Sequence, residues 1–266
     1  MKLNIYQVDA FASKLFTGNP AAVIPLKKWL PDELMQQIAM ENNLSETVFF
    51  VPEEKGSKAD YSIRWFTPTT EINLCGHATL ASAYTIFFIL GKKKKKVVFT
   101  SKSGLLVIKN NKGKLLMDFP SWKPERVDEY PAELSACIGG KEVVGVYKHR
   151  DWLVELHNEE AVASCEPDFT LIKKYFGEII ITAPGKEGTD FVSRFFGPGA
   201  GVDEDPVTGS AHSQLIPFWS EKLGKTKMFA KQLSKRGGEL VCGQLSEERV
   251  LIGGECCFYM KGIIKI

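Results

Sequence analysis

The chain has 266 residues, of which 44% are hydrophobic and 25% are charged, as in a soluble globular protein. Its formal net charge of +2 is small, so composition predicts neither a nucleic-acid partner nor a membrane surface. The longest apolar stretch, residues 78–90, is too short to cross a bilayer and is typical of a buried helix. Six cysteines without a CxxC pair indicate reduced thiols, and the N-terminus shows no secretory signal, so we expect a cytoplasmic protein.

The first part of the chain alternates between strand and helix patterns. Pro31 and the acidic residues after it suit a first helical turn, and Asn42 and Asn43 are typical of its end. The pattern predicts strands at 3–11, 21–25, 47–51 and 60–66, helices at 31–43 and from 76 or 77 to 90, and three further strands up to 119. Five lysines at 92–96 are interpreted as a solvated turn, because no aromatic or further basic residues accompany them.

Residues 120–131 hold three prolines and five charged residues, which is the composition of a linker. The order of elements then repeats, with predicted strands at 143–147, 152–156 and 178–182, and helices at 168–176 and 208–223, the last kinked at Pro217. We therefore expect an N-terminal lobe of residues 1–120 and a C-terminal lobe of residues 121–266. The last strands, near Gly262, could pack on the first lobe.

A sequence repeat supports this division. Residues 60–68 read DYSIRWFTP and residues 190–198 read DFVSRFFGP, with six of nine positions alike in kind. A glycine that opens a helix follows each copy, and these glycines, Gly76 and Gly209, are 133 residues apart, half the chain length. The pattern predicts an α+β fold of two pseudo-symmetric lobes, each a curved, mostly antiparallel sheet wrapped around its central apolar helix.

The repeat has a chemical consequence. The first amides of a helix lack partners and carry the positive end of the helix dipole, and a glycine there leaves them open to an anion. If both helix starts face one cleft, Gly76 and Gly209 would bind the carboxylate of a small substrate without help from arginine or lysine. Each glycine alone could equally be a tight turn into a helix.

Ionisable residues accompany both predicted helix starts. Cys75 and His77 flank Gly76, while Asp205 and Ser210 flank Gly209, and Glu46 precedes an apolar strand, where it could act as a general base or acid. Taken singly, these could be a buried thiol, a solvated imidazole, a turn carboxylate and an exposed glutamate. Their occurrence at paired positions favours a functional site.

Sequence motifs for cofactors are missing. The glycine-rich segment 197–201 is followed by three acidic residues, which would repel a pyrophosphate, and no helix is predicted to start there. No Walker loop, HExxH or GxSxG motif is present. We therefore expect neither a cofactor nor a metal ion.

The chain resembles the PhzF-type, or phenazine-biosynthesis-like, proteins, which share the fold of diaminopimelate epimerase. The resemblance covers nearly the whole length and is carried by the segments 9–11 (DAF), 16–23 (FTGNPAAV), 43–47 (NLSET), 64–68 (RWFTP), 75–79 (CGHAT) and 204–212 (EDPVTGSAH). It implies two similar lobes with the active site between them, and commonly a homodimer.

The resemblance also implies roles for single residues. Glu46 matches the acid/base glutamate, and His77, Asp205 and Ser210 match the polar residues around it. Asn19, Gly76 and Gly209 are implied to bind the substrate. The related epimerases use one cysteine per lobe; Cys75 matches the first, but Asp205 stands in place of the second, which argues against racemisation by two thiols.

Together, these observations predict a cofactor-independent isomerase that moves a proton on a small carboxylic acid, with Glu46 as the proton carrier. One alternative is an amino-acid epimerase or racemase that uses Cys75 with Asp205 or Glu46. A second is a non-catalytic module that binds a small molecule or a protein. The sequence does not specify the substrate.

Overall fold

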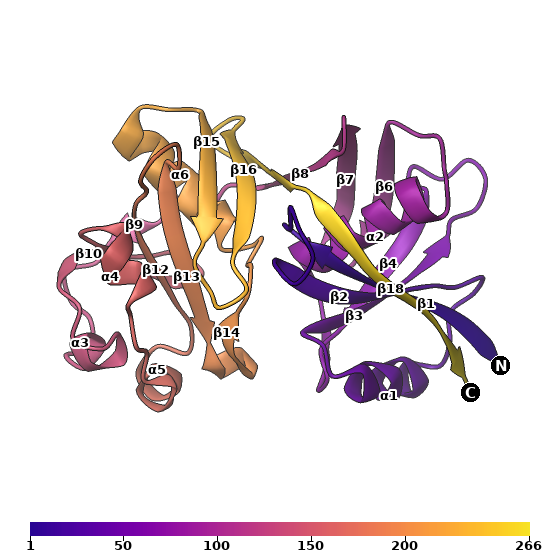
Figure 1. Ribbon diagram of the computed structural model, residues 1–266, viewed down its shortest axis with the longest axis horizontal. Helices are drawn as coiled ribbons and strands as arrows, with labels where there is room; N and C mark the ends of the chain where they lie inside the picture. Colours follow the sequence, from indigo (N-terminus) through magenta and orange to yellow (C-terminus); the bar gives the residue numbers. More distant parts are fainter. The chain divides into compact units, whose positions relative to one another are not determined.

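The computed structural model describes all residues from 1 to 266, and they divide into two units (Figure 1). Unit 1 consists of Met1–Asp118 together with Gly253–Ile266, and unit 2 consists of Phe119–Ile252. The chain passes from unit 1 to unit 2 within strand β8 (Lys114–Pro120) and returns within strand β17 (Arg249–Gly254).

Unit 1 is built on a mostly antiparallel sheet. Its further strands are β1 (Lys2–Ala10), β2 (Asn19–Pro25), β3 (Glu46–Pro52), β4 (Tyr61–Phe66), β5 (Glu71–Ile72), β6 (Lys96–Ser101), β7 (Gly104–Asn111) and β18 (Cys256–Lys265). They pair in the order β18-β1-β2-β3-β4-β6-β7-β8, with β5 beside β4. Only β2–β3 and β4–β6 are parallel. The final strand β18 therefore completes the first unit beside β1, as Figure 1 shows in yellow and indigo.

Unit 2 repeats this arrangement. Its strands are β9 (Glu125–Arg126), β10 (Val143–Lys148), β11 (Trp152–Leu156), β12 (Ile179–Pro184), β13 (Phe191–Gly197), β14 (Val202–Asp205), β15 (Lys227–Gln232) and β16 (Gly238–Gln244). They pair in the order β9-β10-β11-β12-β13-β15-β16, with β14 beside β13, and only β11–β12 and β13–β15 are parallel. The same succession of antiparallel and parallel pairs in both units indicates an internal duplication. The α+β fold class expected from the sequence is confirmed.

One apolar helix is enclosed in each unit. Helix α2 (Gly76–Tyr84) packs on β1, β2 and β3, and all of its residues except Tyr84 are buried. A π-helical turn (Thr85–Ile89) continues it to the end of the predicted helix. In unit 2, α6 (His212–Leu223) packs on β16, and its residues from His212 to Trp219 are buried. Enclosure explains why neither helix has a continuous polar face.

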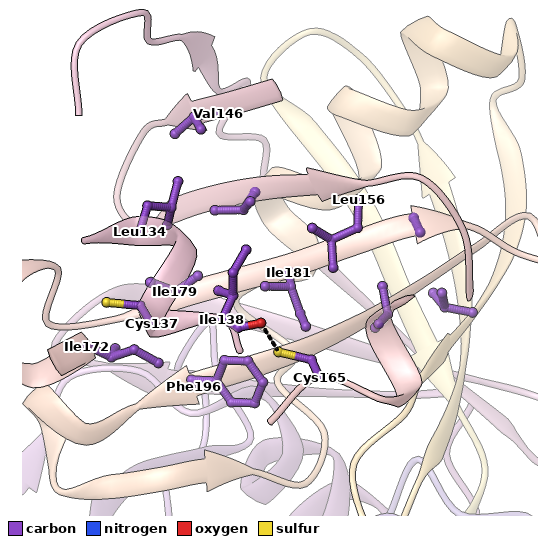
Figure 2. Close-up of a cluster of buried hydrophobic side chains, with 14 residues drawn as sticks. Leu134, Cys137, Ile138, Val146, Leu156, Cys165, Ile172, Ile179, Ile181 and Phe196 are labelled. Carbon is purple, nitrogen blue, oxygen red and sulfur yellow. Dashed lines mark hydrogen bonds between the residues drawn. The ribbon is translucent and has the colours of Figure 1, made fainter. Parts of the chain in front are cut away.

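The remaining helices cover other faces of the sheets. Helix α1 (Asp32–Asn42) buries Met35, Ile38 and Ala39 against unit 1, and its end at Asn43 has the left-handed backbone expected of an asparagine stop. In unit 2, α3 (Leu134–Cys137), α4 (Glu159–Ala163), α5 (Phe169–Tyr175) and a 3₁₀ turn (Pro198–Ala200) accompany β10 to β13. Figure 2 shows the core under these helices, where the Cys165 thiol donates to the carbonyl of Ile138 at 3.3 Å. No helix is long and apolar enough to cross a membrane.

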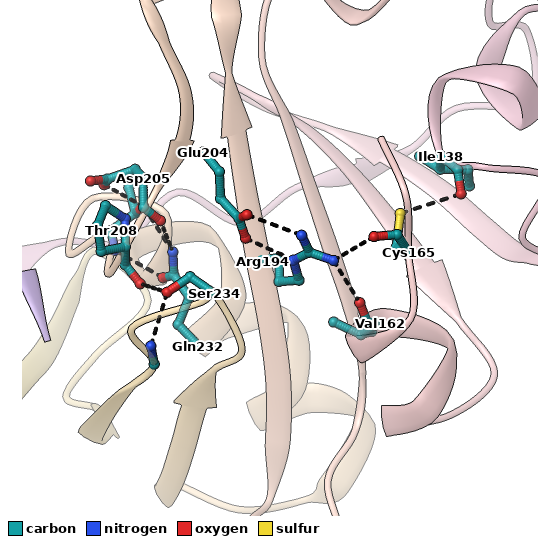
Figure 3. A network of polar contacts seen from close by, with 11 residues as sticks. Ile138, Val162, Cys165, Arg194, Glu204, Asp205, Thr208, Gln232 and Ser234 are labelled. Carbon is teal, nitrogen blue, oxygen red and sulfur yellow. Dashed lines mark hydrogen bonds and ion pairs between the residues drawn. The ribbon is translucent and has the colours of Figure 1, made fainter. Parts of the chain in front are cut away.

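The arginine of the sequence repeat has the same structural role in both units. Arg64 donates from Nε and Nη2 to Glu71 at 2.7 and 2.9 Å, and Arg194 does so to Glu204 at 2.7 and 3.0 Å (Figure 3). Each guanidinium also lies over the phenylalanine two residues later, at 5.2 and 4.9 Å from the ring centroid. Each arginine thus ties its strand to the short neighbouring strand, β5 or β14, which leads to the central helix.

The aspartate that begins each copy of the repeat is also equivalent. Asp60 accepts from the backbone amide of Val98 at 2.9 Å, and Asp190 accepts from that of Phe229 at 2.8 Å. Both carboxylates also pair with a lysine, Lys94 or Lys225 respectively. The repeat therefore encodes scaffold contacts rather than reactive groups.

Gly209 does not open a helix, contrary to the sequence interpretation. Helix α6 begins at His212, and residues 209–211 form a tighter turn in which the amides of His212 and Ser213 donate to carbonyls three residues earlier. The amide of Thr208 is held by Gln232 Oε1 at 2.8 Å, which keeps this residue outside the helix. The helix then runs through Pro217 as one element.

Candidate active site

A carboxylate–imidazole pair lies beside the start of α2 in unit 1. Glu46 Oε2 and His77 Nε2 are 2.9 Å apart, and their side chains are only 13% and 5% exposed. Glu46 is the first residue of β3 and pairs in parallel register with Ala21 of β2, while His77 is the second residue of α2. The ends of two strands and one helix thus bring together residues that are 31 positions apart in the sequence.

Asn19 contacts the other side of the imidazole. Its Nδ2 lies 3.1 Å from His77 Nδ1, and Asn19 is completely buried at the start of β2. An amide NH₂ only donates, so Nδ1 accepts in this arrangement and the ring proton is on Nε2, the nitrogen that lies 2.9 Å from Glu46 Oε2. An Asn19 amide turned to present Oδ1 would suit the doubly protonated ring. Asn19 can therefore accompany either protonation state of His77.

The surroundings stabilise the protonated form of His77. Burial disfavours the imidazolium, but interactions with the Cys75 and Glu46 side chains outweigh it and raise the pKa of His77 well above 6.5. Burial raises the pKa of the Cys75 thiol to about 11, so this thiol is neutral at pH 7. The Glu46 carboxylate is consequently the charge that holds the His77 cation near neutral pH.

Cys75 also lies beside the His77 ring. Its Sγ is 3.5 Å from His77 Nδ1, and it precedes the first residue of α2. Ligand atoms of Glu46, Cys75 and His77 all lie within 4.8 Å of one another, so the set could hold a metal ion. Glu46 Oε2 and His77 Nε2 are, however, closer than the roughly 3.3 Å expected for two ligands about 2.0–2.2 Å from a tetrahedral zinc ion. This spacing favours an ion pair over a bound metal ion.

The polar residues at the corresponding place in unit 2 are arranged differently. Thr208 Oγ1 donates to Asp205 Oδ2 at 2.5 Å, and Gln232 Nε2 donates to the Asp205 carbonyl at 2.8 Å. Figure 3 shows this group on the side of β14 opposite Glu204. Ser210 Oγ accepts from Arg150 Nη2 at 3.1 Å.

His212, the first residue of α6, is a structural histidine. Its Nδ1 lies 2.8 Å from the carbonyl of Thr208, so Nδ1 carries the proton and donates it. The side chain is fully buried, and burial lowers the pKa of His212 to about 4. It therefore remains neutral at pH 7, unlike His77.

The structure thus brings five of the residues singled out in the sequence together in unit 1: Asn19, Glu46, Cys75, Gly76 and His77. The remaining three, Asp205, Gly209 and Ser210, lie together in unit 2. Sequence reasoning missed Arg150, which contacts Ser210 from the loop between β10 and β11. Nothing in the local sequence, HRDW, distinguishes this arginine from one on an ordinary exposed turn.

Comparison with known proteins identifies the family of the chain. The model of the family described as phenazine biosynthesis-like protein (PhzC-PhzF) matches residues 8–262. The chain belongs to this family. It is 46% identical to a Pseudomonas aeruginosa protein named as an uncharacterized isomerase, and the match covers 100% of both chains.

Solved structures of this PhzF family are also similar. A PhzF-family protein of Enterococcus faecalis has a TM-score of 0.94 and 45% identity, with 100% of both chains covered. A hydroxyproline epimerase of Agrobacterium vitis has a TM-score of 0.62 at 11% identity, covering 99% of this chain and 92% of its own. At that identity the likeness shows the fold alone, so the PhzF fold is shared with epimerases.

Proposed function

We propose that this PhzF-family protein is a cofactor-independent isomerase that moves a proton between carbons of a small carboxylic acid. The observation that carries the proposal is the buried Glu46–His77 pair, 2.9 Å apart, at the start of α2. It combines a proton acceptor with a neighbouring cation in a place shielded from water. The isomerase named among its relatives supports the same reaction class.

The proposed reaction needs no oxidant or reductant. His77 engages Oε2 of Glu46, and Glu46 accepts a proton from a substrate carbon that conjugation with the carboxyl group makes acidic. The C–H electron pair moves into the conjugated system, where the protonated His77 and the first amides of α2 stabilise the developing negative charge. Glu46 or a neighbouring group then delivers a proton to a different carbon, which restores the enzyme. Because a carboxyl proton exchanges with solvent, deuterium from the solvent can enter at that carbon.

Residues from both units have roles in the proposal. In unit 1, Asn19 and the amides at Gly76 would hold the substrate near Glu46. In unit 2, Asp205, Ser210 and Gly209 would provide polar contacts to a ligand. Within unit 2, Thr208 holds the Asp205 carboxylate, so this group is better suited to orienting a ligand than to moving a proton.

We also propose that the protein is a homodimer. Strand β18 exposes a series of large apolar side chains that is unusual for a solvated surface: Phe258, Tyr259, Met260 and Ile263. Sedimentation equilibrium should give twice the chain mass, and Tyr259→Lys should shift the mass toward that of one chain. A single-chain mass for the parent protein would contradict the dimer.

The epimerase alternative has less support. Epimerisation by Cys75 needs a thiolate, and burial raises the pKa of that thiol to about 11. At pH 7 only about one molecule in 10⁴ would carry the thiolate, according to the difference between pH and pKa. Glu46 is therefore the better proton carrier of the two.

Glu46→Gln tests the proposal because it keeps the size of the side chain but cannot exchange a proton at neutral pH. The parent protein and the variant would be incubated in deuterated water with a panel of unsaturated carboxylic acids and amino acids, and label at carbon would be followed by NMR. We expect a loss of 10²–10⁴-fold or more in label uptake. Glu33→Gln, on the exposed start of α1, is the control and should exchange at the parent rate. Exchange by Glu46→Gln at the parent rate would refute the proposal.

A further inference from the structure

A charged residue of unit 2 contacts the serine of the proposed site. Arg150 lies in the loop between β10 and β11, and its Nη2 donates to Ser210 Oγ at 3.1 Å across 60 positions of sequence. The family resemblance gives Arg150 no role. Its side chain is 39% exposed, so burial alone does not account for its orientation.

Three contacts hold the guanidinium in place. Nε and Nη2 of Arg150 donate to the two carboxylate oxygens of Asp151 at 2.8 and 2.5 Å. The guanidinium also lies 4.8 Å from the ring centroid of Trp122, whose backbone amide donates to the carbonyl of Ser213 at the start of α6. The ion pair with both oxygens of Asp151 and the contact with the Trp122 ring fix the position and the plane of the guanidinium group.

Asp151 is itself anchored to the helix that follows Ser210. Its side chain is only 2% exposed, and Gln214 Nε2 of α6 donates to Oδ2 at 3.0 Å. The backbone amide of Asp151 donates in return to Gln214 Oε1 at 3.3 Å. Arg150 is therefore docked on α6 through Asp151 and Gln214, and this fixes its distance from the turn that carries Ser210.

The contact determines where the hydroxyl proton of Ser210 points. A guanidinium has only donors, whereas a serine hydroxyl has one proton and two lone pairs. Ser210 Oγ must therefore accept from Arg150, and its own O–H points away from the guanidinium. A neighbouring cation also makes the hydroxyl a stronger donor.

We propose that Arg150 is a positioning residue that fixes Ser210 as a hydrogen-bond donor to a carboxylate of the substrate. The proposal rests on the proposed function, in which Ser210 contacts the substrate. Arg150 acts through Ser210 rather than on the reacting atoms. This arrangement therefore selects substrates that place a carboxylate oxygen at the Ser210 hydroxyl.

The contact can be tested without a substrate by introducing a thiol with Ser210→Cys. A guanidinium at hydrogen-bond distance favours the thiolate, while the carboxylates of Asp151, Glu178 and Asp205 oppose it. We therefore compare Ser210→Cys with Ser210→Cys/Arg150→Met, and follow alkylation by iodoacetamide against pH after subtracting the parent chain. The midpoint should be about one pH unit lower when Arg150 is present. Arg126→Met, which removes an exposed arginine paired with Asp128, is the matched control and should leave the midpoint unchanged.

Equal midpoints with and without Arg150 would overturn the proposal. A merely structural role predicts that outcome together with a lower melting temperature of Arg150→Met. A failure of the proposed function would appear in a different measurement. Label exchange that survives Glu46→Gln would refute the proposed function, but it would not affect the pH midpoint of alkylation in Ser210→Cys.

The consequence for binding is tested by a double-mutant cycle with succinate as the carboxylate probe, measured by calorimetry. Ser210→Ala should weaken binding about tenfold, and Arg150→Met about three- to tenfold. In the Ser210→Ala background, Arg150→Met should change the affinity by less than about twofold, because its effect passes through the hydroxyl. Equal losses in both backgrounds, or no binding of succinate to the parent protein, would overturn the role assigned to Arg150.

Discussion

The two central helices begin in different chemical surroundings although the strands that lead to them are equivalent. At the start of α2, His77 faces the Glu46 carboxylate, and its pKa is raised well above 6.5. At the start of α6, His212 faces a backbone carbonyl, and burial lowers its pKa to about 4. A buried imidazole thus becomes a stable cation or a neutral scaffold group according to whether its partner is charged.

The difference shows how a duplicated fold can divide its tasks. The arginine and aspartate of the sequence repeat keep the same contacts in both units, so the scaffold has remained symmetric. The ionisable groups beside the helix starts, in contrast, differ between the two units. We infer that unit 1 moves the proton, while Asp205 and Ser210 of unit 2 contribute hydrogen bonds to the ligand.

Of the two helix-start histidines, His77 should have the larger effect on activity when it is replaced. His77→Gln removes the cation beside Glu46, and we expect label uptake at carbon to fall by about 10²–10³-fold, within the range of acid–base and electrostatic contributions. His157→Gln, which alters a histidine that is 53% exposed, is the matched control. A loss of less than about threefold in His77→Gln would show that His77 is not the cation that stabilises the developing negative charge.

His212, the counterpart of His77 in unit 2, should affect stability rather than turnover. Between pH 6.5 and about 4 an unfolded chain protonates this histidine, whereas the fold keeps His212 neutral, so the free energy of unfolding falls as pH decreases through this range. The expected contribution is about 2 kcal/mol between pH 6.5 and 5. Urea unfolding at these two pH values measures it.

His212→Gln should remove this pH dependence even if it lowers stability at both pH values. His157→Gln should retain it. An equal change in the free energy of unfolding between the two pH values in the parent protein and in His212→Gln would contradict a neutral His212 in the fold.

Asp205→Asn should have a moderate effect on activity. The change keeps a side-chain acceptor for the hydroxyl of Thr208 but removes the charge. Because we assign Asp205 to binding, we expect KM to rise about tenfold with kcat nearly unchanged, in steady-state kinetics on a substrate found by the label-exchange panel. A fall in kcat as large as that of Glu46→Gln would make Asp205 a second proton carrier.

Cys75→Ala should have the smallest effect. With a thiol pKa of about 11, Cys75 supplies no base at pH 7, so label uptake should change by less than about threefold. Cys242→Ala is a control for the loss of a buried thiol in unit 2. Complete loss of exchange in Cys75→Ala would favour the epimerase alternative.

The sequence predicted the duplicated architecture because local signals repeat in it. The apolar run after Gly76 indicates an enclosed helix, and the stop at Asn42 and Asn43 marks the end of α1, which the structure places at Asn42. The start of α6 was wrong by about four residues. Thr208 is held by Gln232, and a side-chain contact between residues 24 positions apart leaves no local pattern.

The candidate site was predictable only in part, for the same reason. The motifs singled out Glu46 and His77, but their 2.9 Å contact depends on how β3 and α2 pack. Arg150 was not found, because its orientation depends on Asp151 and on Gln214, a residue 63 positions from Asp151. The opposite protonation of His77 and His212 likewise follows from tertiary partners, since both residues lie at the start of an apolar helix.

That opposition can be measured directly by NMR, with the imidazole resonances of the four histidines followed against pH and assigned with His→Gln variants. We predict that His77 remains an imidazolium well above pH 6.5, and that Glu46→Gln lowers its midpoint because the compensating charge is lost. His212 should remain neutral down to about pH 4. If His77 and His212 both titrate near pH 6.5, or if Glu46→Gln leaves His77 unchanged, the division of tasks between the two helix starts is wrong.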